Sequence, residues 1–169
     1  MRKDFRQKLL KGLFLFYLAV LTWIIVFKMS FSLSEIQGVR GINFIPFHAS
    51  VVVNGKIHIS EMIQNMLAFA PFGIYAGILW KKWSIKEKIF AFFAVSFIYE
   101  IVQYILAVGR TDVTDIINNT LGGTLGLMIY GILRKMCRTE KRTEKFITIC
   151  AGIVTVLMTG FVVILICCN

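Results

Sequence analysis

The stretch that decides the fold is YEIVQYILAVGRTDVTDIINNTLGGTLG, residues 99–126. Its first part is apolar like the end of a membrane helix, yet it contains Glu100 and Gln103. Its last part resembles the start of another membrane helix, yet it contains two asparagines and three glycines. Between these parts lie three charged residues: Arg110, Asp112 and Asp115. A chain this apolar needs a reason to gather so many polar groups in one place.

The composition indicates a membrane protein. The chain of 169 residues is 57% hydrophobic and 17% charged, whereas about a quarter of the residues in a soluble domain are charged. A hydrocarbon core of about 30 Å requires about 20 apolar residues per helix. Since the apolar segments are not striped, a soluble amphipathic bundle is excluded. We predict a single domain, residues 1–169, with an all-α, polytopic transmembrane helical bundle of about five spans, roughly 9–27, 62–79, 89–108, 116–133 and 146–166.

The basic residues predict the orientation of the bundle. Fifteen of the 19 Lys and Arg residues lie in the N-terminal segment and in loops 81–88 and 134–145, which five spans place on one side. Lys and Arg mark the cytoplasmic side. We therefore expect a multi-pass protein of the bacterial plasma membrane with a cytoplasmic N-terminus. The net charge of +10 suits anionic membrane lipids as partners, and we expect no nucleic-acid partner.

Residues 28–60 form a long outer loop in this topology. Asn54-Gly55 lies between two apolar runs and resembles a two-residue hairpin turn. Because an isolated hairpin is marginally stable in water, we expect the loop to pack on the outer mouth of the bundle. Asn43 and Pro46 are expected to shape a turn within it.

The polar residues within the spans gather in the outer half of the membrane. With a rise of about 1.5 Å per residue, Glu100 lies about 12 Å and Gln103 about 8 Å below the outer boundary. Asn65 in the second span lies about 6 Å deep, and Asn118 and Asn119 in the fourth lie at about 5–6 Å. Three spans and a connecting segment thus contribute to one polar layer.

Helical spacing places these residues on shared faces. Ser96, Glu100 and Gln103 recur at intervals of four and three, so they share one face of the third span. The fourth span has a corresponding face of four residues: Asp115, Asn118, Asn119 and Gly122. The connection between the two spans is short, so they are antiparallel neighbours. We expect their polar faces to meet each other and Asn65.

Glycine and proline predict how the spans pack. Gly122 and Gly126 have the small-residue spacing that lets membrane helices approach closely, and Gly123 adds a third small residue. Pro71 lies in the middle of the second span, where it removes a backbone donor and clashes with the preceding turn. We expect it to kink this span and to favour a cavity on the outer side.

Each polar group also has a purely structural interpretation. Glu100 and Gln103 could join helices to one another, and Asp112 and Asp115 could cap the fourth span. Residues of this kind would scatter through both leaflets, whereas these lie in one layer. The pattern favours a functional cluster of seven residues: Asn65, Glu100, Gln103, Arg110, Asp112, Asp115 and Asn119.

No metal or cofactor is expected, and no catalytic residue is assigned. The four cysteines have no zinc or disulfide spacing, and the chain has no H-E-x-x-H, nucleophile elbow or glycine-rich phosphate loop. Oxygen ligands from Glu100, Asp112 and Asp115 would suit Mg²⁺ or Ca²⁺. That site stays open as the less favoured alternative.

The chain resembles the VanZ family of membrane proteins over nearly its whole length. The resemblance rests on FYLAVLTWIIVFKM (residues 16–29), NFIPF (43–47), EMIQNMLAFAPFG (61–73) and above all on residues 99–131. The family pattern of a glutamate, a glutamine three residues later, a connecting segment with aspartates, and then asparagine and glycines falls on eight positions here: Glu100, Gln103, Asp112, Asp115, Asn119, Gly122, Gly123 and Gly126. The family's frequent arginine falls on Arg110.

This resemblance implies a role in glycopeptide resistance at the Gram-positive envelope, with preference for lipoglycopeptides such as teicoplanin. We expect a non-enzymatic outer-leaflet polar pocket that binds or excludes a lipid-like ligand, with a lipoglycopeptide or a lipid-linked wall precursor as partner. The alternative is a membrane enzyme acting on a lipid-linked phosphate substrate of the cell envelope, in which Arg110 holds the phosphate and a carboxylate acts as base. A third interpretation is a small partner subunit of envelope machinery.

Overall fold

A computed structural model describes residues 2–27, 39–46, 52–53, 56–57 and 59–168. Within these ranges, five helices are long and apolar enough to cross a membrane. Their bounds, in chain order, are α1 Arg2–Phe27, α2 Ile59–Leu79, α3 Ile85–Leu106, α4 Val113–Cys137 and α5 Glu140–Cys168. The predicted helical fold class with five membrane-length helices is therefore confirmed.

The helices belong to two compact units, each described by itself. The terminal unit consists of residues 1–19 and 131–169, and the central unit consists of Val20–Tyr130. In the terminal unit, Leu10 and Ile147 are buried, and Arg6 Nη1 donates to the Lys141 carbonyl oxygen at 3.5 Å. The polar residues singled out above all lie in the central unit.

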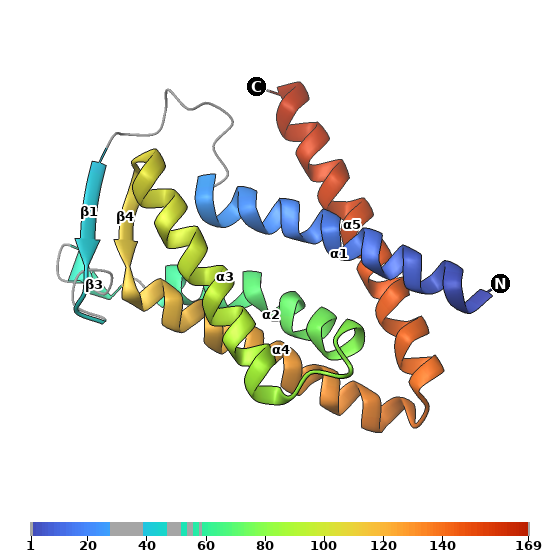
Figure 1. Cartoon of the computed structure of the whole chain (residues 1–169). Helices are drawn as coiled ribbons and strands as arrows, with labels where there is room; N and C mark the ends of the chain where they lie inside the picture. The colour runs from blue at the N-terminus through green and yellow to red at the C-terminus, as the bar shows by residue number, and fades with distance from the viewer. Residues whose placement is uncertain (1, 28–38, 47–51, 54–55, 58, 169) are drawn as a thin grey trace. The chain divides into compact units, whose positions relative to one another are not determined.

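Short strands accompany the helices of the central unit. The strand β1, Val39–Asn43, pairs in parallel with β4, Val108–Asp112, so that Asn43 lies opposite Asp112 (Figure 1). A parallel pair needs a long crossover, and the chain between the two strands supplies it with α2 and α3. The strands β2, Val52–Val53, and β3, Lys56–Ile57, pair antiparallel, as the hairpin prediction requires. Asn54 and Gly55 themselves lie outside the described residues.

The segment between the third and fourth predicted spans differs from the expectation. The sequence predicts a turn there, but the structure has the strand β4. The predicted span 89–108 overruns the helix, because Ala107 caps α3 with a left-handed φ of 53°. The helix α4 begins at Val113, before the predicted start at 116, so Asp115 lies in its first turn. The difference has a physical reason: long-range pairing with β1 holds Val108–Asp112 extended, whereas local sequence spacing predicts a turn there.

The interior of the central unit is aromatic. Phe69 and Phe72 on α2 are buried with Phe92 and Tyr99 on α3. The rings of Phe72 and Phe92 pack edge to face, with centroids 5.1 Å apart. Phe69 and Tyr99 do so at 6.2 Å. Such pairs add about 0.5–1.5 kcal/mol to the effect of burial, so they fix α3 against α2.

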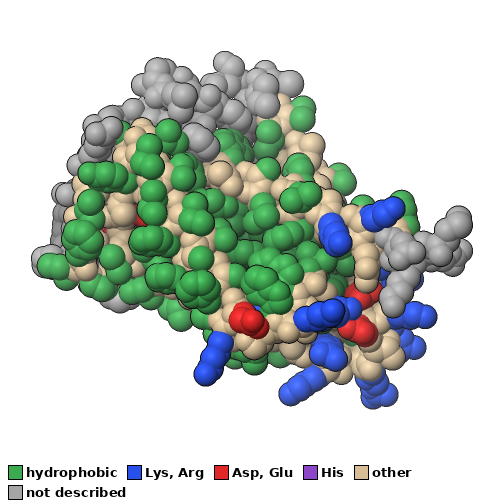
Figure 2. All heavy atoms as spheres, viewed as in Figure 1, with side chains coloured by type: hydrophobic (Ala, Val, Ile, Leu, Met, Phe, Trp, Pro, Cys, Tyr) green, Lys and Arg blue, Asp and Glu red, His purple; other side chains and the backbone are tan. Residues whose placement is uncertain are grey.

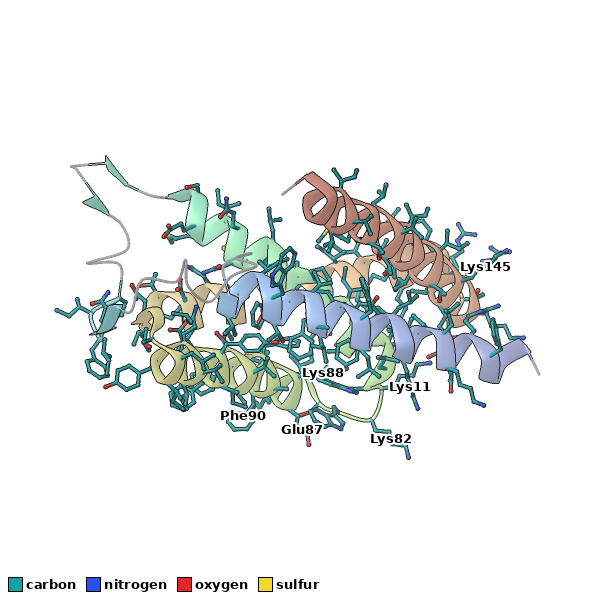
Figure 3. The ribbon with its side chains drawn as sticks, turned by 90° about the horizontal axis from the view of Figure 1, so that it is seen from above. Lys11, Lys82, Glu87, Lys88, Phe90 and Lys145 are labelled. Carbon is teal, nitrogen blue, oxygen red and sulfur yellow. The ribbon has the colours of Figure 1, made fainter. Side chains whose placement is uncertain are left out.

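The surface of the central unit carries the apolar side chains expected of a bilayer-facing protein. Leu67, Phe90, Ile105 and Met128, one or more from each of α2, α3 and α4, are all more than half exposed. Figure 2 shows hydrophobic side chains over much of the visible face. Figure 3 labels Phe90 and Glu87 near the start of α3. Exposed apolar area of this kind is stable in contact with lipid chains.

Candidate functional site

The polar residues lie at one end of the central unit, where α1 and α3 end and α2 and α4 begin. Following the predicted orientation, we call this the outer end. Along α3, the polar face predicted from spacing is buried: Ser96 is 0%, Glu100 1% and Gln103 3% exposed. Burying a polar group costs free energy unless the group is hydrogen-bonded. The hydrogen-bond partners of these residues therefore show which of them hold the helices together and which face a pocket.

Glu100 holds the start of α4. Its Oε2 accepts the backbone N–H of Asp112 at 2.9 Å, and its backbone carbonyl accepts the Thr111 hydroxyl at 3.2 Å. Asp112 in turn caps α4, because its Oδ1 accepts the backbone N–H of Thr114 at 2.8 Å. The capping that the sequence allows for Asp112 is therefore present, and Glu100 stabilises the capping residue.

Asn43 connects β1 to the same point. Its Nδ2 donates to Asp112 Oδ2 at 3.0 Å, and its Oδ1 accepts the backbone N–H of Ile45 at 3.2 Å. Both oxygens of the Asp112 carboxylate therefore accept a hydrogen bond from the chain. Asn43 thus shapes the turn expected of it and also contacts the polar cluster, which sequence spacing gives no means to foresee. Pro46 lies in that turn and is exposed.

A second set of hydrogen bonds joins the helices. Asn65 Nδ2 on α2 donates to Asp115 Oδ1 on α4 at 2.8 Å. Asn119 Nδ2 on α4 donates to the Ser96 hydroxyl on α3 at 2.8 Å. Gln103 Nε2 on α3 donates to the carbonyl oxygen of Ile25 on α1 at 2.8 Å. The polar faces of the three predicted spans thus meet, and each bond joins a different pair of helices.

Three buried polar atoms have no hydrogen-bond partner within the described part of the chain. They are Gln103 Oε1, Asn118 Nδ2 and Asn119 Oδ1. A buried unsatisfied polar atom costs about 1–3 kcal/mol. Such atoms are uncommon and indicate a ligand, a water molecule or a functional requirement.

A pocket of about 190 Å³ opens at the outer end, and one of these three residues lines it. Its walls come from four helices: Ile24 and Ile25 of α1, Glu61, Gln64 and Asn65 of α2, Gln103 of α3, and Asp115 of α4. Three residues of the predicted cluster therefore line the pocket. Glu100, Asp112 and Asn119 do not line it, and instead form the hydrogen bonds that position the ends of α3 and α4.

Glu61 and Gln64 were missed by the sequence analysis. They precede Asn65 by four residues and by one, so helical spacing puts Glu61 on the face of Asn65. That spacing was the available signal. Pro71 lies inside α2 and is not among the residues that line this pocket, so the predicted effect of a kink at Pro71 on the cavity stays a prediction.

Gly122 and Gly126 lie where α4 closely approaches α2, and Gly123 lies against α3. A Cβ atom on Gly122 would meet the backbone of Met66 at 2.2 Å, and one on Gly126 would meet the Ala70 carbonyl oxygen at 1.8 Å. A Cβ atom on Gly123 would meet the Phe92 ring at 2.6 Å. No larger residue fits these positions without moving α2 or α3, and the close approach aligns Asn65 with Asp115.

Two features considered from the sequence remain: the role of Arg110 and a possible metal site. Arg110 belongs to β4, but its side chain is outside the described part of the structure, so its predicted place in the functional cluster stays a prediction. Among the described residues, no three His, Cys, Asp or Glu side chains come together in a group that could hold a metal ion. The open alternative of a metal between Glu100, Asp112 and Asp115 has no support from this arrangement.

Comparison with known proteins places the chain in a family. A family model described as VanZ/LLP1 matches residues 14–134, which include every residue of the predicted cluster. The curated protein named Protein VanZ, from Enterococcus faecium, is 35% identical over 133 residues, which cover 78% of this chain and 79% of that protein. No solved structure matches. The chain therefore belongs to the VanZ family.

Proposed function

We propose that this protein contributes to resistance against lipoglycopeptides of the teicoplanin type by binding the polar end of a lipid-like molecule in the pocket at its outer end. The supporting observation is the pocket itself, which combines apolar walls from Ile24 and Ile25 with polar walls from Asn65, Gln103 and Asp115. A lipid-like molecule presents the same combination. Membership of the VanZ family supports the resistance role, and the distribution of Lys and Arg supports the outer position of the pocket.

The size of the pocket limits what it holds. Ligand pockets for drug-sized molecules measure about 300–1,000 Å³, whereas this pocket measures about 190 Å³. It therefore accommodates one compact polar group and not a whole glycopeptide. We propose that the attached acyl chain lies along the exposed apolar side chains of the neighbouring helices. Binding at this depth would reduce the anchoring of a lipidated antibiotic beside the wall precursors.

The test measures inhibitory concentrations of teicoplanin and vancomycin in a Gram-positive host. The host carries the wild-type gene, an empty vector, Asp115→Asn, Glu100→Gln or Glu87→Gln, and membrane levels are measured by blot. We expect the wild type to raise the teicoplanin value at least fourfold, that is, by roughly 0.8 kcal/mol or more in effective binding, and to leave the vancomycin value unchanged. Equal protection against both drugs would contradict the proposal.

The variants separate a binding role from the enzymatic alternative. Asp115→Asn removes a charge from the pocket wall and should lower teicoplanin protection. Glu100→Gln keeps an oxygen that accepts the Asp112 N–H and should be tolerated in a binding protein. Glu87→Gln, outside this pocket, is the matched control and should behave as wild type. A changed lipid in extracts of the wild-type strain that disappears with Glu100→Gln would favour the enzyme instead.

A further inference from the structure

We infer that a groove at the start of α3 binds one anionic phospholipid of the cytoplasmic leaflet, with an acyl chain along the helix and the phosphate at Lys86. The predicted orientation places this end of α3 on the cytoplasmic side, opposite to the pocket described above. The inference therefore does not rest on the proposed function. Three features of the central unit carry it: the walls of the groove, its length along the helix and the charges at its mouth.

The groove has aromatic walls and is large enough for a ligand. Its volume is about 530 Å³, within the range of about 300–1,000 Å³ that is usual for ligand pockets. The residues that line it are Trp83, Lys86, Glu87, Phe90, Ala91 and Ala94. Trp83 stacks on Trp80 with ring centroids 4.7 Å apart, and Phe90 stacks on Phe93 at 6.4 Å. Each aromatic wall is therefore held by a second ring, and the short side chains of the two alanines leave room between them.

The groove has the length of one membrane leaflet. Ala94 lies nine residues after Ile85, which corresponds to about 14 Å along the helix. Half of a hydrocarbon core of about 30 Å is about 15 Å. Trp83 at the mouth is 45% exposed, and tryptophan is enriched at the level of the lipid headgroups. The groove thus runs from the headgroups to about the middle of the membrane, which is the path of a single acyl chain.

The lysines at the mouth favour an anionic headgroup. Lys86 lines the groove, and Lys82 lies one residue before Trp83 in the preceding turn. Both lysines are exposed, so their ammonium groups are accessible to a lipid phosphate. A basic residue near an anionic membrane surface raises binding about fivefold, or about 1 kcal/mol. The charge at the mouth is therefore complementary to an anionic phospholipid.

One carboxylate among the lining residues opposes this attraction and limits its size. Glu87 lines the groove, and its Oε2 accepts the backbone N–H of Ser84 at 2.6 Å. Figure 3 shows Lys82, Glu87 and Phe90 along one edge of the view. Lys82 and Lys86 together outweigh the single carboxylate, so we expect a moderate preference for anionic over zwitterionic headgroups.

The same charges argue against a second copy of the chain as the occupant. Most homodimers have a two-fold axis, which brings the same surface of both copies together. Packing on this groove would place Lys82 and Lys86 of one copy beside the same lysines of the other. Like charges repel each other, whereas the phosphate of a lipid attracts them.

The experiment uses the full chain in nanodiscs of phosphatidylcholine that contain one tenth phosphatidylglycerol or one tenth phosphatidylethanolamine. Native mass spectrometry counts the lipids that stay on the protein and reports its oligomeric state. We expect phosphatidylglycerol to be retained about fivefold over phosphatidylethanolamine, which corresponds to about 1 kcal/mol. Equal retention of the two lipids, or a preference for phosphatidylethanolamine, would overturn the inference.

Removing one charge tests the headgroup contact. Lys86→Gln should reduce the preference for phosphatidylglycerol about fivefold, to near parity, because one basic residue is lost at the mouth. Lys145→Gln is the matched control, since it removes an exposed lysine of α5 that does not line the groove, and it should keep the wild-type preference. An equal loss for both variants would show that the overall positive charge retains the lipid, and the inference would then be wrong.

Filling the groove tests the acyl-chain contact. Ala94→Leu places a larger side chain in the groove and should remove one retained lipid, whatever its headgroup. Ala151→Leu changes a partly exposed alanine of α5 in the same way and should keep the wild-type number, and helical circular dichroism verifies the folding of both variants. A wild-type lipid count for Ala94→Leu would overturn the inference. A wild-type dimer that Ala94→Leu converts into a monomer would also overturn it, because the groove would then bind a second copy.

Discussion

Each end of α3 has a glutamate whose carboxylate accepts a backbone hydrogen bond, but the two glutamates differ in burial and in how far away the donor lies in sequence. At the start of the helix, Glu87 is exposed and its carboxylate accepts the backbone N–H of Ser84 at 2.6 Å, three residues away. Near the end of the helix, Glu100 is 1% exposed and accepts the backbone N–H of Asp112 at 2.9 Å, twelve residues away. One carboxylate completes a local turn, and the other joins two structural elements.

The same contrast extends to the neighbouring residues. The start of α3 is a capping box, in which the Ser84 hydroxyl accepts the Glu87 N–H at 3.3 Å. Such a box forms within one turn of chain and needs no other element. At the other end, Gln103 contacts Ile25, 78 residues away in sequence. Polar groups at the outer end are therefore ordered by tertiary structure, which is what a pocket with fixed walls requires.

The largest expected effect comes from replacing the two glutamates by leucine. Glu100→Leu leaves the buried Asp112 N–H without its acceptor, which should lower the free energy of unfolding by about 1–3 kcal/mol. Glu87→Leu removes one solvent-exposed hydrogen bond of the capping box, which water can replace, so it should lower the free energy of unfolding less than Glu100→Leu does. Unfolding by SDS in mixed micelles, followed by tryptophan fluorescence, measures both.

Equal losses of unfolding free energy for Glu100→Leu and Glu87→Leu would contradict the difference between the two ends of α3. They would mean that Glu100 contributes no more than a local contact, and that the hydrogen bond to Asp112 does not stabilise the outer end. Retained expression of both variants in membranes is the control for correct insertion.

A smaller effect is expected from Asn43→Ala at the outer end. The substitution removes the donor to Asp112 Oδ2 and the acceptor for the Ile45 N–H. Asp112 still caps Thr114, so the loss in unfolding free energy should be about 0.5–1.5 kcal/mol. Pro46→Ala, in the same exposed turn, is the control and should stay within about 0.5 kcal/mol. A loss no greater than that of the control would show that β1 does not stabilise the cap of α4.

Some of these contacts could be predicted from the sequence, and others could not. The five helices and the buried face of Ser96, Glu100 and Gln103 follow from apolar length and helical spacing, both of which are local. The pairing of β1 with β4 does not, because Asn43 and Asp112 are 69 residues apart and nothing in either segment specifies the other. Tertiary packing likewise decided that Gln103 lines the pocket while Glu100 does not.

The smallest effect is expected at the start of α3. Ser84→Ala removes the acceptor for the Glu87 N–H but leaves that end of the helix exposed to solvent, which can replace the bond. Loss of an exposed cap of this kind costs about 0.5–1 kcal/mol. Ser84→Asp should restore the wild-type value, because aspartate caps as well as serine does. In mixed-micelle unfolding, a loss for Ser84→Ala larger than that for Glu100→Leu would reverse the comparison: the local cap would then stabilise α3 more than the tertiary hydrogen bonds at its outer end.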